Sequence, residues 1–576
     1  MIPRRIINIV NFIRYDDPRD PALDLLEPVV RQMQLLREAG LPCTWLLQFD
    51  ALVAGPYVDF LKANLPDNHE VGLWFEINRM HCDAAGVAFR GADGLNWDHH
   101  VQAAFSVGYT PAERDRLADV AVRTFREIFG REHGPRSVAA WYLDARTLAR
   151  LSEKHGVEAF AICRDQYGTD GYTFWGGPFS GGYYPSRRNT LSPAQTADGQ
   201  IGTPVFRLLG PDPVHQYDTG LGTSWQGVLT MEPIYKAAGK NPEWVRRFLD
   251  IVAGAPALAF SHAQAGQENS FGWPAMAEGY AMQVAEFVRR RGTAEGEGRE
   301  GRGGEGRLEF ETLGDTGRWF RRTFPADETG TPSQAIVALR DTLGGARRSI
   351  WYHSGHYRCN LLVEGDRLYL RDLHLFDERY AERYLEERCD LHAARFDTLP
   401  VLDGFGWSAS ADDRALGRWF ADGSELRLTG EPEVTEANAG EGRLTVRFPV
   451  AFPVAFADAF ADAADVLTVV FEKTGWRSAL QSGAALLLSV RWACAAATSF
   501  VGVRGAADGV RTPELCFEHE AFSYALPVTT GEAETAADGF DVTGRTDKAG
   551  AGGIGFQVAN GARASHSLTA VRSMLA

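Results

Sequence analysis

The sequence predicts an α/β protein with an irregular (β/α)7 barrel in residues 1–290 and a C-terminal β-sandwich region in residues 308–576. Three observations indicate this division. Short apolar runs alternate with helical stretches before residue 290, as in domains built on a parallel sheet or barrel. Residues 291–307 are Gly and charged residues with no apolar side chain longer than Ala, which is typical of a linker. Beyond them, apolar residues recur with a period of two, as in antiparallel strands.

The strand and helix pattern of the first half can be followed in order. Ile6–Phe12 is apolar enough for a buried strand, and Leu25–Ala39 repeats apolar residues at helical spacing before Gly40. Thr110–Glu113 is a capping box that opens a helix ending at Gly130. Further strands are predicted at 43–49, 70–75, 137–143, 157–163, 227–231 and 257–261, and further helices at 147–155 and 242–253. The long Gly-, Tyr- and Trp-rich stretch 168–226 makes the barrel irregular.

The second half consists of short strands edged by Gly, Asp or Pro, which suit an antiparallel sandwich. They form either one large β domain or two smaller ones. The predicted strands are 349–352, 360–363, 367–370, 425–429, 443–448, 466–471, 486–490 and 500–503.

Composition excludes several classes of protein. With 59 Lys+Arg against 75 Asp+Glu, the net charge is −16, and no basic run offers the footprint that nucleic acid requires. The seven cysteines are scattered without a C-x-x-C pair, so neither a disulfide framework nor a structural zinc site is expected. We predict a cytoplasmic protein that binds no membrane, because the sequence has neither a signal-peptide pattern nor a long apolar span. The oligomeric state stays open, with a homo-oligomer among the alternatives.

The chemistry of a barrel concentrates at the carboxyl ends of its strands, where the loops converge on one mouth. Five predicted strand ends carry a carboxylate, and the same loops are rich in Trp and Tyr. A sugar-cleaving site requires this combination: an acid, a base or nucleophile, and flat apolar faces for pyranose rings. We therefore predict a carbohydrate-active hydrolase, a glycosidase acting on an oligo- or polysaccharide with paired carboxylates, no metal and no cofactor.

The position of each side chain suggests its role. Asp144 is the predicted nucleophile or base, and Glu268 or Glu232 the general acid with a raised pKa. The residues predicted to bind substrate are Arg14, Gln48, Trp74, Glu76, Trp141, Asp165, Asp170, Trp175 and His262.

Structural roles compete with these assignments. Asp144 directly precedes a predicted helix and could serve as its N-cap. Glu76 and Glu232 each end an apolar run, where a buried carboxylate must be paired. His262 follows an apolar strand and could be a hydrogen-bonded core histidine.

Three motifs, in this order, resemble the start of the polysaccharide deacetylase (NodB-type) barrel over roughly residues 5–265. They are Asp16-Asp17-Pro18, Cys43-Thr-Trp-Leu-Leu and His69-Glu-Val-Gly72. The resemblance implies a divalent metal held by an Asp and a His-x-x-x-His pair, but Trp74 stands where the first His should be, and His81, His99 and His100 have other spacings. This departure argues against metal-dependent deacetylation.

Glycoside hydrolase families 57 and 38 share the same irregular barrel. That resemblance places the nucleophilic carboxylate at the end of the fourth strand, at Asp144, and puts Glu268 near the family 57 acid/base position. The runs 11–14, 45–50, 164–171 and 184–187 are most similar to an uncharacterised bacterial family, a domain of unknown function.

Two alternatives follow. In the first, the chain is a metal-dependent polysaccharide or amino-sugar deacetylase, with Asp17 and substitute ligands holding the metal and His262 as the acid. In the second, it is a sugar-binding protein without catalysis.

Overall fold

The computed structural model describes most of the chain. The described residues are 3–130, 132–169, 172–219, 227–254, 258–291, 307–327, 330–395, 398–404, 416–451, 465–482, 486–492, 499–504, 514–519, 522–530, 532–536, 539–546 and 554–557. Asp170 and nearly all of the predicted linker lie outside them.

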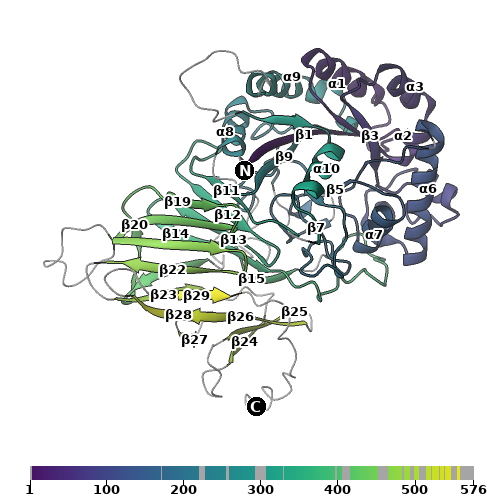
Figure 1. Ribbon diagram of the computed structural model, residues 1–576. Coiled ribbons are helices and arrows are strands. Elements are labelled where there is room, and N and C mark those ends of the chain that lie inside the picture. Colours follow the sequence, from purple (N-terminus) through teal and green to yellow (C-terminus); the bar gives the residue numbers. More distant parts are fainter. Residues whose placement is uncertain are drawn as a thin grey trace.

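The first unit is a curled sheet of parallel strands, which confirms the predicted α/β barrel class (Figure 1). Apart from β10, its described strands run in the order β9-β1-β2-β3-β4-β5-β8. No ladder joins β8 to β9 within the described residues, so the barrel is irregular there. The bounds are β1 Arg4–Ile13, β2 Thr44–Leu47, β3 Glu70–Trp74, β4 Ser137–Ala139, β5 Ala159–Ile162, β8 Val205–Arg207 and β9 Phe260–Ala265.

Helices cover the outside of this sheet, as Figure 1 shows for α1, α6 and α9. The predicted capping box is present: the Thr110 N–H donates to Glu113 Oε2 at 2.8 Å. The bounds are α1 Leu26–Ala39, α2 Phe49–Val53, α3 Gly55–Asn64, α4 Arg79–Ala85, α5 Val101–Ala104, α6 Pro111–Phe129, α7 Ala145–Glu153, α8 Pro242–Ala253 and α9 Trp273–Arg290.

Two predictions in this half differ from the structure. Residues 227–231 form no strand, and Thr230 makes only an isolated bridge to Pro211. The strand that completes the sheet is instead β8, inside the stretch 168–226. The paired strands β6 (Gln166–Thr169) and β7 (Tyr172–Phe174) lie at the start of that stretch. Short strands in a Gly-rich stretch give no periodic signal, so the sequence did not reveal them.

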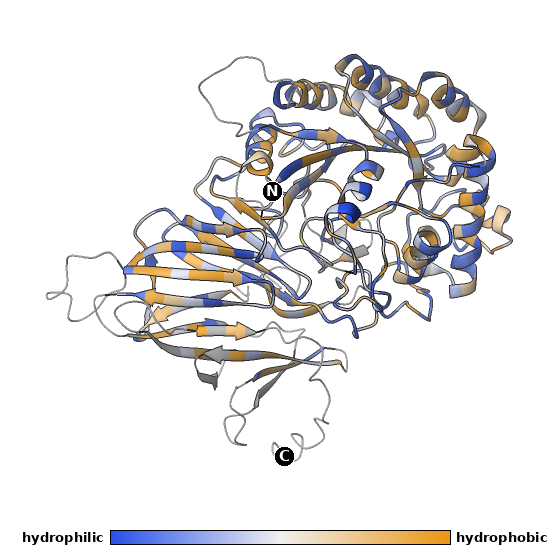
Figure 2. Cartoon of the chain, viewed as in Figure 1, coloured by the Kyte–Doolittle hydropathy of each residue, from blue (hydrophilic) through white to orange (hydrophobic). Residues whose placement is uncertain are grey.

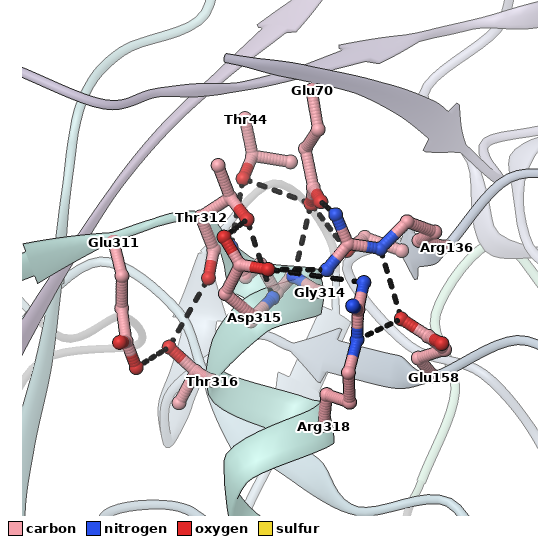
Figure 3. Close-up of polar contacts among 12 residues, drawn as sticks. Thr44, Glu70, Arg136, Glu158, Glu311, Thr312, Gly314, Asp315, Thr316 and Arg318 are labelled. Atoms are coloured by element: carbon pink, nitrogen blue, oxygen red, sulfur yellow. Dashed lines mark hydrogen bonds and ion pairs between the residues drawn. The ribbon is translucent and has the colours of Figure 1, made fainter. Parts of the chain in front are cut away.

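The sheet also takes a strand from beyond residue 307. β10 (Glu309–Glu311) pairs in parallel with the first half of β1, on the edge that β2 occupies further along. Helix α10 (Leu313–Thr323) follows, and its first N–H groups donate to Thr44 Oγ1 at 2.9 Å and to Glu70 Oε1 at 3.0 Å. Arg136 joins Glu70 at 3.4 Å and Asp315 at 2.6 Å (Figure 3). Residues 309–323, which the sequence assigned to the C-terminal region, thus close the amino-terminal end of the barrel.

The C-terminal region contains two antiparallel sheets that share one apolar core. Their strands carry long apolar stretches, orange in Figure 2. The first sheet comprises β11 Gln334–Ala338, β12 Arg348–His353, β13 Tyr357–Glu364, β14 Arg367–Leu375, β15 Leu399–Asp403, β16 Gly417–Ala421, β17 Ser424–Glu425, β23 Leu486–Trp492, β27 Glu532–Ala536 and β28 Gly539–Thr546. The second comprises β18 Arg427–Leu428, β19 Glu433–Asn438, β20 Arg443–Ala451, β21 Asp465–Glu472, β22 Gly475–Gln481, β24 Ser499–Arg504, β25 Glu514–His519, β26 Phe522–Thr530 and β29 Ile554–Gln557.

The two halves of the chain are joined by buried ion pairs. Arg358 on β13 lies 2.7 Å from Asp165, which follows barrel strand β5, and 2.9 Å from Asp372 on β14. Arg207 lies 2.8 Å from the other oxygen of Asp165. Because each of these charges is buried and paired, the first C-terminal sheet is fixed against the loops of the barrel.

Candidate active site

A pocket of about 190 Å³ lies at the carboxyl ends of the barrel strands. Each strand of the curled sheet, except β2 and β10, is followed by a residue that lines this pocket. These residues are Arg14 after β1, Glu76 after β3, Trp141 after β4, Arg164 after β5, Leu209 after β8 and Glu268 after β9. Loop residues, among them Glu232, Trp97 and His99, complete the wall. The structure therefore brings together five of the residues predicted for the site: Arg14, Glu76, Trp141, Glu232 and Glu268.

Glu76 is a structural anchor of the pocket. Its Oε2 accepts hydrogen bonds from Trp74 Nε1 at 2.9 Å and from Arg14 Nη2 at 2.8 Å. Its Oε1 accepts one from Trp141 Nε1 at 3.0 Å. The Gln48 amide donates to the Glu76 carbonyl at 3.2 Å from behind. Both carboxylate oxygens are occupied, so Glu76 orients Arg14 and two indole rings.

Glu268 has the surroundings of an acid or base. It is buried, and its Oε2 lies 2.7 Å from Arg14 Nη1. Burial raises the pKa of Glu268 to about 7, although Arg14 opposes the rise, and the negative charges of Glu76 and Glu232 add to it. A carboxyl group that titrates near neutral pH can give up and take back a proton during turnover.

Glu232 supplies a second carboxylate on the same pocket. Thr230 Oγ1 donates to its Oε2 at 2.9 Å, and Gln267 Nε2 donates to its Oε1 at 3.3 Å. Gln267 is the chain neighbour of Glu268, so the two carboxylates stand on adjoining loops. Their contacts differ: Thr230 and Gln267 donate to Glu232, while Glu268 is buried with its Oε2 against Arg14.

Aromatic rings flank these charges. Trp141 lines the pocket, and Trp74 lies behind it, stacked on Phe12 with centroids 4.1 Å apart. Trp97, which the sequence did not nominate, places its ring 4.3 Å from the Arg14 guanidinium. It comes from a loop with no strand-end signal, so no sequence pattern marked it.

Asp144 is placed differently. It is fully buried and does not line the pocket. It caps α7, accepting from the Thr147 N–H at 3.0 Å, and it pairs with Arg114 at 3.2 Å. Burial raises the pKa of Asp144, but Arg114 and Thr147 bring it below its ordinary value. These are the surroundings of a structural carboxylate.

Of the other nominated residues in the described ranges, five are also absent from the pocket wall: Gln48 and Trp74, which donate to Glu76, and Asp165, Trp175 and His262. Both oxygens of Asp165 are held by arginines at the junction of the two halves. Trp175 packs there too, against Tyr217, with centroids 4.8 Å apart. His262 is a core residue whose Nε2 bonds Asn8 at 2.8 Å, because β9 continues to Ala265, past the predicted end at residue 261. Burial lowers the pKa of His262 to about 3.

The Asp17 surroundings do not fit the metal site that the deacetylase resemblance implies. Arg19 donates to both Asp17 oxygens, from Nε to Oδ1 at 2.9 Å and from Nη2 to Oδ2 at 2.6 Å. Among the described residues, two other groups bring three donor atoms within 4.8 Å of one another: Asp98-His99-His100 and Asp372-His374-Asp403. The first adjoins the pocket through His99.

One protein family matches part of the chain: a domain of unknown function with a solved structure, DUF3863, at residues 103–244. This match agrees with the resemblance to an uncharacterised domain seen in the sequence. No curated protein matches the chain. Among the helices in the described ranges, none has the length and apolar composition needed to cross a bilayer.

Several solved structures are similar to the chain, including the following three. A Parabacteroides distasonis protein, provisionally described as a glycoside hydrolase/deacetylase, is 17% identical over 68% of this chain and 88% of its own, with a TM-score of 0.49. A Mycobacterium smegmatis protein, provisionally described as a polysaccharide deacetylase, is 12% identical over 56% and 91%, with a TM-score of 0.33. A family 4 acetyl xylan esterase from Clostridium thermocellum, in complex with a cobalt ion, is 9% identical over 27% and 57%, with a TM-score of 0.17. At such values these likenesses carry no argument about activity, which has to come from the pocket.

Proposed function

We propose that the chain is a carbohydrate-active hydrolase, specifically a glycoside hydrolase, with Glu268 as the general acid and Glu232 as the base or nucleophile. The observation that carries this is one pocket whose wall holds Glu232 and Glu268 besides the anchored Glu76, with the pKa of Glu268 near 7. A pair of carboxyl groups with separate roles is what hydrolysis of a glycosidic bond requires.

The residues divide the reaction between them. Protonated Glu268 donates its proton to the glycosidic oxygen as the bond to the anomeric carbon breaks. Arg14, 2.7 Å away, stabilises the carboxylate that results. Glu232 either bonds to the anomeric carbon or removes a proton from the water that does so, and Thr230 and Gln267 hold it in place. Trp141 offers the ring face on which a pyranose would stack.

A panel of chromogenic α- and β-glycosides tests the proposal. We expect Glu268→Gln and Glu232→Gln each to lower kcat/KM for the cleaved glycoside by at least about 100-fold, the usual size of general acid–base effects. Glu278→Gln is the matched control, because the Glu278 side chain is 82% exposed on the outer helix α9. Full activity in either site variant would refute the assignment. Sugar binding without turnover of any glycoside would instead favour the non-catalytic alternative.

Metal-dependent deacetylation remains as a second candidate because of one specific observation. Asp98, His99 and His100 bring their donor atoms together, His99 is part of the pocket wall, and His100 Nδ1 lies 2.6 Å from Asp98 Oδ1. Imidazole and carboxylate donors suit zinc and related divalent ions. Zinc binding by calorimetry, lost in His99→Asn, together with acetate release that a chelator abolishes, would support this candidate over the glycosidase.

A further inference from the structure

One buried arginine differs from all the others. In the described part of the chain, seven arginines are buried, and six lie within 4.0 Å of at least one carboxylate: Arg14, Arg114, Arg207, Arg290, Arg358 and Arg371. The seventh, Arg164, is 1% exposed and makes no ion pair with any described residue. It is also one of the residues that line the pocket.

Within the described ranges, the contacts of Arg164 include no carboxylate. Its Nη1 donates to the Asp165 carbonyl at 2.7 Å, and its Nε is buried without a partner among the described residues. Of the described carboxylates on this side of the barrel, Asp165 pairs with Arg207 and Arg358, and Glu232 accepts hydrogen bonds that include those from Thr230 and Gln267. The other pocket arginines, Arg14 and Arg19, already have carboxylate partners.

A buried guanidinium without a counter-charge is costly, and an arginine fork matches the oxygens of an anion. Since no carboxylate of the described residues pairs with Arg164, a ligand that enters the pocket can supply the anion. We infer that Arg164 binds an anionic group of the sugar substrate: the carboxylate of a uronic acid or a sulfate ester. This inference rests on the proposed function of the same pocket and narrows its substrate class.

Binding measured without turnover tests the inference. In the Glu268→Gln background, calorimetry at pH 7 would compare three hexuronic acids (glucuronic, galacturonic and mannuronic), the 6-sulfates of the parent hexoses, and the neutral hexoses. We expect one anionic series to bind at least about ten-fold more tightly than the neutral one, as a charge-assisted contact provides. A preference for uronic acids assigns the carboxylate, and a preference for sulfates assigns the sulfate ester.

Adding Arg164→Gln should remove the preference, whereas Arg164→Lys should keep part of it. Arg19→Gln is the matched control, because it removes a pocket cation that Asp17 already neutralises. Thermal melts show whether each variant is folded, and the lysine variant keeps the test valid if the glutamine variant is not. Equal affinity for anionic and neutral sugars, no binding of either, or a preference that survives in Arg164→Gln would overturn the inference. Glycoside turnover tests the hydrolase proposal separately, so either can fail alone.

Discussion

Substitutions of Asp144 can distinguish two hypotheses for this residue: that it is the catalytic nucleophile, or that it is a structural helix cap. Asp144→Ala leaves Arg114 buried without its carboxylate, which costs about 3–5 kcal/mol for a broken buried pair. Arg114 also donates to the carbonyls of Tyr109, Tyr384 and Glu387, each at 2.7 Å, so the low end of that range applies. Loss of the cap to Thr147 adds about 1 kcal/mol. We expect Asp144→Ala to lower the free energy of unfolding by about 4 kcal/mol.

Asp144→Asn is the matched variant, because its amide oxygen can still cap α7 and only the charge is lost. It should cost about 1 kcal/mol less than alanine, since the cap remains. Urea denaturation followed by tryptophan fluorescence measures both variants, and glycoside turnover by the folded fraction is measured in parallel. If Asp144→Asn were as stable as the parent but its kcat fell about 100-fold or more, Asp144 would be catalytic and the structural reading would be refuted.

Three further predictions concern the other buried charges. The folded-state pKa of Glu268 is raised to about 7, so this residue lowers the free energy of unfolding progressively as pH rises from about 4.3 to 7. Glu268→Gln should therefore become more stable relative to wild type over that range. If the free energy of unfolding changed with pH equally in both proteins, the raised pKa would be contradicted. In the proposed acid role, the same pKa predicts that kcat/KM falls as pH rises above about 7, and a profile of kcat/KM against pH without this limb would argue against Glu268 as the acid. Arg358→Met removes the ion pair to Asp165 that joins the two halves and leaves Asp372 buried without its arginine, which should cost about 3–5 kcal/mol of stability at the junction. We expect faster limited proteolysis between the halves, and unchanged cleavage would show that Arg358 does not hold them together.

Local sequence was sufficient for the elements with strong signals. The capping box at Thr110 and the apolar run of β1 both formed as predicted, because each depends on neighbours within a few residues. The predicted strand at residues 425–429 is instead two short strands, β17 and β18, which belong to different sheets. The alternation of apolar and polar residues continues with a period of two where the chain crosses from one sheet to the other, so the sequence does not indicate that the strand is interrupted.

The site was predicted in outline but not in its details. The rule that the functional residues of a barrel follow its strands placed Arg14, Glu76 and Glu268 at the pocket, where the structure has them. Arg164 follows β5 and lines the pocket too, but the rule was applied there only to carboxylates. It failed to separate Asp144 from the others, because every strand end carries the same local signal. The rule did not select Trp97 or His99, because these residues reach the pocket from a loop that does not directly follow a strand.

The sequence by itself determined which residues could form strands and helices and where polar side chains would follow a strand. Only the tertiary structure decided which of those side chains face an open pocket and which are paired. The decisive partners come from distant segments: Arg114 reaches Asp144 across 30 residues, and Arg358 reaches Asp165 across 193. The chemistry of a carboxylate depends on the charges within a few ångströms of it, and those neighbours are brought together by the fold.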